Sequence, residues 1–134
     1  MRQKWLLRLL FAAVATGATT ATAGCGAPAK EGPPTEAICP LAQTLSYANF
    51  GKRFFELYCL GCHSEQKLGA DRKGAPPEVN WDTLEAIQAG KREIDKRAAA
   101  GPRATNQFMP DESPRPTMME RLQLGEWLAC GAPQ

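Results

Sequence analysis

The chain has 134 residues and a formal net charge of +2, from 16 Lys and Arg side chains against 14 Asp and Glu. A chain of this length fits one small domain with short additions. It contains no run of Lys and Arg of the kind that forms a nucleic-acid surface, so nucleic acid is not an expected partner.

Residues 1–24 have the layout of a secretory signal peptide, with a basic start, a short apolar run and small residues at 21–23. The apolar run has about half of the ~20 residues that a membrane-spanning helix needs. A short N-terminal membrane anchor is the alternative. Cleavage would leave 13 basic and 14 acidic side chains and a net charge of −1. We therefore expect an exported protein, in a bacterial periplasm.

The stretch TAGC at 22–25 resembles a bacterial lipobox, whose cysteine carries a diacylglycerol after cleavage. Thr22 stands where a lipobox usually has Leu, so cleavage after Ala23 without a lipid is the alternative. Residues 25–46 are rich in Pro and polar side chains and lack an apolar period, which predicts a flexible linker. A lipid on Cys25 would tether the domain at 47–134 to a membrane.

Three helices are predicted in this domain. Apolar residues at Phe50, Phe54, Leu57 and Tyr58 indicate a helix over 47–58. No strand pattern stands out, so the expected fold class is all-α.

The second and third helices are predicted from capping boxes. Asp82 with Glu85 is expected to start a helix over 83–97, whose apolar face is Leu84, Ile87 and Ile94. Thr117 with Glu120 is expected to start the closing helix within TMMERLQLGEWLAC, which ends before Gly131 and Pro133.

The five cysteines are Cys25, Cys39, Cys59, Cys62 and Cys130. Free thiols are uncommon in an oxidising compartment, so each is expected to have a role. If Cys59 and Cys62 act together, Cys39 and Cys130 are left to form a disulfide, and Cys25 is the odd one. Such a bridge would contribute roughly 4 to 5 kcal/mol in the entropy model. The alternative is that Cys39 or Cys130 is buried and unpaired.

The motif CLGCH, at 59–63, holds the chain's one histidine. A zinc site would need a fourth ligand from a second Cys pair or His, and neither exists. Thiol–disulfide exchange at C-x-x-C normally belongs to a βαβ pattern, which is absent. Covalent haem attachment uses the whole motif: Cys59 and Cys62 would bond to the porphyrin, and His63, on the same side of a helical turn, would bind the iron.

A soft thioether is the expected second axial ligand. Met109 lies in NQFMPDESP, a polar loop without a helix period, where an apolar side chain needs another reason, and Pro110 would stiffen the backbone behind it. Met118 and Met119 are the alternatives, but they are expected to open the closing helix and pack on it. The sequence therefore predicts His63 and Met109 as the iron ligands.

The sequence at this point resembles the class I cytochrome c family. The resemblance covers about residues 45–131 and rests on CLGCH followed some 45 residues later by Met-Pro. The family's crossing of its first and last helices has matches in Gly51, Phe55, Leu124 and Trp127. The resemblance implies a small cytochrome c fold, with three to four helices around one covalent haem c. It also implies that a Pro carbonyl, from Pro76 or Pro77, accepts a hydrogen bond from His63.

The expected function is single-electron transfer, because two fixed axial ligands leave no open position on the iron and no spare His remains for acid–base work. The protein is expected to be an electron carrier and not an enzyme, with redox proteins as brief partners. A haem-based sensor or gas-binding module and a haem-free thiol oxidoreductase are the alternatives.

Overall fold

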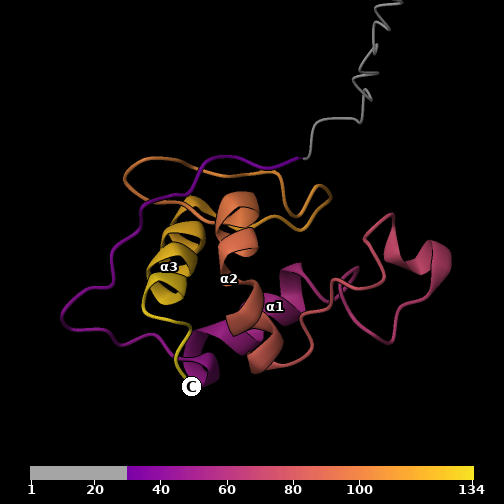
Figure 1. The fold of residues 1–134 in the computed structure, drawn as a ribbon, viewed down its shortest axis with the longest axis horizontal. Coiled ribbons are helices and arrows are strands. Elements are labelled where there is room, and N and C mark those ends of the chain that lie inside the picture. The colour runs from indigo at the N-terminus through magenta and orange to yellow at the C-terminus, as the bar shows by residue number, and fades with distance from the viewer. Residues whose placement is uncertain (1–29) are drawn as a thin grey trace, which may run out of the picture.

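The structure is a computed structural model that describes residues 30–134. The predicted signal peptide and Cys25 lie outside the described residues. Within 30–134, three α-helices are joined by long loops, and the one strand-like feature is an isolated bridge between Ala100 and Thr105 (Figure 1). The all-α class is therefore confirmed for this part of the chain. None of its helices has the length and apolar character needed to span a bilayer.

The helices lie close to the predicted positions. Their bounds are η1, a π-helical turn at Tyr47–Gly51; α1 at Lys52–Tyr58; η2, a 3-10 turn at Gly69–Arg72; α2 at Leu84–Ala98; and α3 at Met118–Ala129. Together η1 and α1 make the helix predicted over 47–58. Figure 1 shows η2 in a loop that extends away from the three helices.

One of the two predicted capping boxes is present. The Oγ of Thr117 accepts a hydrogen bond from the backbone of Glu120, whose carboxylate accepts one from the backbone of Thr117. The box predicted from Asp82 is wrong, because Thr83 is the residue that caps α2. Asp82 instead accepts hydrogen bonds from the hydroxyl of Ser64 and the N–H of Glu65.

The core lies where the first and last helices cross. Phe55 and Trp127 are both buried, with ring centroids 6.3 Å apart. A Cβ on Gly51 would lie 2.7 Å from the ring of Trp127, so the helices approach too closely for a larger residue. This crossing was predicted from the sequence and is confirmed. The apolar face of α2 is also confirmed, since Leu84 and Ile87 are among its buried residues.

Cys39 and Cys130 form a disulfide, as predicted, with Cα atoms 4.7 Å apart. Cys130 caps the end of α3, and Cys39 lies before the first helix. The backbone N–H of Tyr47 also donates to the carbonyl of Pro133, at 2.8 Å. The two ends of the domain are therefore joined both covalently and by a hydrogen bond, and Figure 1 shows the C-terminus beside η1.

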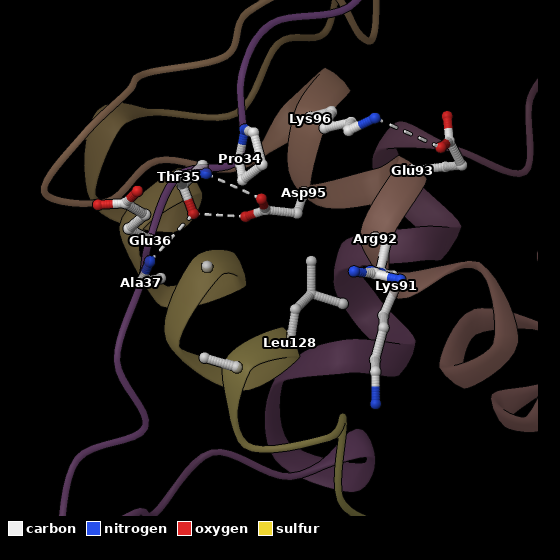
Figure 2. Close-up of a pocket in the computed structure, with 12 residues that line it drawn as sticks. Pro34, Thr35, Glu36, Ala37, Lys91, Arg92, Glu93, Asp95, Lys96 and Leu128 are labelled. Atoms are coloured by element: carbon white, nitrogen blue, oxygen red, sulfur yellow. Dashed lines mark hydrogen bonds and ion pairs between the residues drawn. The ribbon is translucent and has the colours of Figure 1, made fainter.

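Residues 30–46 have no helix, as their composition predicts, but they differ from a flexible linker because part of the segment is held against the domain. Thr35 is fully buried, and its N–H and hydroxyl both donate to the carboxylate of Asp95 on α2 (Figure 2). The N–H of Gly32 donates to the carbonyl of Lys96 at 2.8 Å. The segment therefore belongs to the folded unit at these points, and the reason is tertiary hydrogen bonding that a local pattern does not show.

Candidate functional site

One cavity of about 540 Å³ brings together all four side chains that the sequence singled out. Cys59, Cys62, His63 and Met109 all line it, although Met109 lies 46 residues beyond His63. Aromatic and aliphatic side chains make up much of the remaining wall, including Phe54, Phe55, Tyr58, Val79, Trp81 and Ile94. Its size is within the range of cofactor sites, which are typically a few hundred to about 1,000 Å³.

The CLGCH motif forms a turn that continues directly from α1. The N–H of Cys59 donates to Phe55, and the N–H groups of Cys62 and His63 both donate to the carbonyl of Cys59. This local winding is why residues 59, 62 and 63 face the same cavity. Neither Cys59 nor Cys62 is in a disulfide, and both are partly buried.

The imidazole of His63 is oriented by a backbone carbonyl. Its Nδ1 lies 3.2 Å from the carbonyl oxygen of Val79, which would accept a hydrogen bond from Nδ1–H and leave Nε2 as the free nitrogen. Burial holds the pKa of His63 below its ordinary value, and the Arg72 and Arg97 cations act in the same direction. The neutral form, which can bind a metal, is therefore favoured at neutral pH.

The prediction that Pro76 or Pro77 supports His63 is wrong. The carbonyl of Pro76 accepts from Arg72 at 2.6 Å, and that of Pro77 accepts from the side chain of Asn80 at 3.1 Å. The supporting carbonyl is that of Val79, which lies in the same loop.

Arg72, at the end of η2, is a site residue that no sequence pattern singled out. It is 4% exposed and makes six hydrogen bonds, five of them to backbone carbonyls of the loop between Ser64 and Val79. One of these goes to the carbonyl of Val79, at 2.9 Å. Arg72 and His63 therefore share one acceptor, and the guanidinium both closes the loop and fixes the oxygen that orients the imidazole.

Met109 is half-buried and packs against the hydrophobic core beside the cavity. Met118 and Met119, the alternative ligands, do not line this cavity. They begin α3 as predicted, but they are 50% and 64% exposed and do not pack on the helix as expected. Met109 is thus the methionine that the structure brings near Cys59, Cys62 and His63.

A second buried cation, Arg121, holds the loop that carries Met109. It lies on α3 at 3% exposure and donates to the carbonyl of Met109 at 3.0 Å. A signal for it was present in the sequence. Arg121 precedes Leu124 and Leu128 by three and seven residues, which places a charged residue on the apolar face of the helix.

The cavity wall also has a basic side. Lys30, Arg72, Lys73 and Arg97 line it, with Glu93 and Asp111 as the acidic residues. Arg97 is shared between the cavity and ion pairs with Glu31 and Glu93. A ligand with an apolar body and anionic groups would fit such a wall.

The donor atoms do not form a conventional metal-ion cluster. Within residues 30–134, no three His, Cys, Asp or Glu side chains converge as they would in a zinc site. Burial raises the pKa of Cys59 to about 12, with Cys62 adding to the rise and Arg121 opposing it. Thiol exchange depends on a lowered thiol pKa, so the environment of Cys59 is unlike that of an exchange cysteine.

Comparisons of the chain with models of protein families, with curated proteins and with solved structures find no match.

Proposed function

We propose that the protein carries single electrons through a haem bound covalently at Cys59 and Cys62, with His63 and Met109 as the iron ligands. The observation that carries the proposal is that these four side chains line one cavity. When bound, the haem would supply a reversible one-electron change between ferric and ferrous iron. The class of protein would be that of the small c-type cytochromes, which the motif CLGCH and the later Met-Pro resemble.

The residues around the cavity fit this group. His63 presents a neutral imidazole whose Nδ1 is engaged by Val79, so Nε2 is available to the iron. Met109 offers a soft sulfur, which favours the ferrous state. The apolar wall would exclude water from the porphyrin, and basic side chains such as Arg97 would compensate its carboxylates.

Electron transfer is favoured over catalysis because the proposed haem would occupy the side chain best suited to acid–base catalysis, the imidazole of His63. His63 is the one histidine, and no second imidazole remains to move a proton on a substrate. His63 and Met109 together would leave the iron without an open position for a substrate. The partners would then be redox proteins that dock briefly, and the location would be the periplasm, with Cys25 as the residue that a lipid would modify.

The direct test is expression in a bacterium that has a haem maturation system. We expect a red protein whose colour stays with the polypeptide in acid acetone, and an intact mass that includes one haem. The variant Cys59→Ala/Cys62→Ala should lose the covalent haem, whereas Cys39→Ala/Cys130→Ala should keep it. Colourless wild-type protein with Cys59 and Cys62 unmodified would refute the proposal.

The two rival functions predict other results. A gas-binding module or haem sensor needs an open or labile position on the iron, so the reduced protein would bind carbon monoxide at neutral pH. A thiol oxidoreductase would be colourless and would need a reactive thiol, against which the raised pKa of Cys59 argues. If a Met109→Ala variant kept the spectrum of a methionine-ligated haem, the sulfur ligand would have to be Met118 or Met119.

A further inference from the structure

Arg121 is a buried cation that joins three segments of the chain. Its Nη1 donates to the carbonyls of Ala98 at 2.6 Å, Asn106 at 2.9 Å and Met109 at 3.0 Å. A guanidinium Nη carries two hydrogens, so one of them is shared between two of these oxygens. The contacts tie α3 to the last turn of α2 and to the loop after it. Arg121 itself is not part of the cavity wall.

The charge of Arg121 is balanced by carbonyl dipoles. No carboxylate within the described residues forms an ion pair with it, although six ion pairs are present elsewhere in 30–134. An arginine in a protein keeps its proton. Hydrogen bonds from an ionised donor are stronger than neutral ones, and a buried charge that lost them would be costly. The three carbonyls and the guanidinium therefore hold one another firmly.

Met109 is held at both of its backbone groups. Its N–H donates to the carbonyl of Arg97 on α2 at 2.9 Å, and its carbonyl accepts from Arg121 on α3. Asn106 is fixed in a similar way. Its N–H donates to the backbone carbonyl of Ala99 at 2.8 Å, and its side-chain amide donates to the backbone carbonyl of Asp95 at 2.9 Å. The loop is thus attached to two helices just before Met109 and at Met109 itself.

We propose that Arg121 is the positioning residue for Met109, and that it keeps the sulfur at the iron against competing ligands. The inference rests on the proposed function, because it takes Met109 as an iron ligand. A side chain on a mobile loop loses conformational entropy each time it binds the iron. A loop that is already held in place avoids most of this entropic cost. Without Arg121 the carbonyls of Met109 and Asn106 would lose a donor, and the loop could move away from the cavity.

The test measures imidazole binding to the ferric haem protein by stopped flow, together with the sulfur-to-iron charge-transfer absorption. Arg121→Met should keep its covalent haem and lose most of that absorption. It should also bind imidazole about tenfold faster or more, because leaving one buried carbonyl without a donor shifts the equilibrium between the held and the released loop by roughly tenfold. Arg121→Gln, whose amide keeps a shorter donor, should fall between. Met109→Ala sets the rate without a sulfur ligand.

Two controls separate positioning from general destabilisation. Arg103→Met removes an exposed arginine from the same loop, and Gly51→Ala weakens the helix crossing away from Met109. Both should bind imidazole at the wild-type rate. An Arg121 variant that carries its haem and binds imidazole at the wild-type rate would overturn the inference. If Arg121→Met does not fold, the result for Arg121→Gln decides the question. A wild-type protein as fast as Met109→Ala would instead overturn the ligand set, and the inference with it.

Discussion

At the scale of single residues, two buried arginines hold the long loops of this fold in place. Arg72 and Arg121 are 4% and 3% exposed, and each uses its guanidinium on backbone carbonyls. Arg72 acts on the loop that supports His63, and Arg121 on the loop that carries Met109. Long loops without secondary structure leave many carbonyls without partners, and a guanidinium with five N–H groups can satisfy several at once.

Arg72→Met is expected to lower the free energy of unfolding by about 2–4 kcal/mol, because several buried carbonyls lose a charged donor at once. The measurement is urea denaturation of the purified protein. Arg103→Met is the matched control, since its ion pair with Glu36 is exposed and such pairs contribute about 0–1 kcal/mol. Equal effects of the two variants would contradict the role given to Arg72.

At the scale of helices, the crossing between η1 and α3 depends on the absence of a side chain at Gly51. Gly51→Ala would place a Cβ 2.7 Å from Trp127, inside normal contact distance. We expect a loss of about 1–3 kcal/mol from overpacking, although alanine favours a helix over glycine by ~1 kcal/mol. Thermal and urea unfolding measure the change.

Gly61→Ala is the control for this substitution, because a Cβ there would meet nothing within 4 Å. The double variant Gly51→Ala/Trp127→Phe should lose less stability than the two single variants together, since the smaller ring makes room for the methyl group. Additive losses would mean that the contact between Gly51 and Trp127 does not limit the packing.

The start of α3 carries a pH dependence through Glu120. Hydrogen bonds from Thr117, with one from Tyr58, hold the pKa of Glu120 below its ordinary value of 4.5. A lowered pKa in the folded state contributes stability above pH 4.5, and that contribution is lost as the pH falls through the folded-state pKa. Urea midpoints should therefore fall less steeply with acid in Glu120→Gln than in wild type.

Glu126→Gln on the exposed side of the same helix is the control, and it should follow the wild-type curve. An acid dependence in Glu120→Gln as steep as that of wild type would place the titrating group elsewhere.

The helices could be predicted because their signals are local. Phe54, Ile87 and Leu124 repeat with their neighbours at helical spacing, and Thr117 with Glu120 caps its own helix. The start of α2 could not be chosen between Asp82 and Thr83, because both residue types cap helices well. The partner that engages Asp82 is Ser64, 18 residues away.

At the scale of the whole molecule, the disulfide closes nearly the entire domain, because its two cysteines are 91 positions apart in the sequence. The chain-entropy model gives about 4–5 kcal/mol for a loop of this length. Cys39→Ala/Cys130→Ala should lose about this much in urea denaturation, and a reductant should bring wild type to the same midpoint. Wild type that is unaffected by full reduction would show that the helix crossing holds the ends together without the bridge.

Long-range contacts set the limit of what the sequence could predict about this molecule. Four cavity residues could be predicted from the motif CLGCH and from a methionine in a polar loop. The carbonyl that accepts a hydrogen bond from His63 was assigned to the wrong residue. Thr35 was expected in a linker and instead is bound to Asp95, 60 residues later. Such pairings leave no periodic pattern in either segment, so only the folded chain reveals them.

The order of the cysteines along the chain has a consequence for biosynthesis. Chains are made from the N-terminus, so Cys39, Cys59 and Cys62 are all present before Cys130 exists. Cys39, Cys59, Cys62 and Cys130 allow three pairings among themselves, and before Cys130 is made an oxidant can join Cys39 only to Cys59 or Cys62 within this set. Each wrong pairing consumes a sulfur of the cavity. The yield of correctly assembled protein should therefore depend on when oxidation begins relative to completion of the last helix.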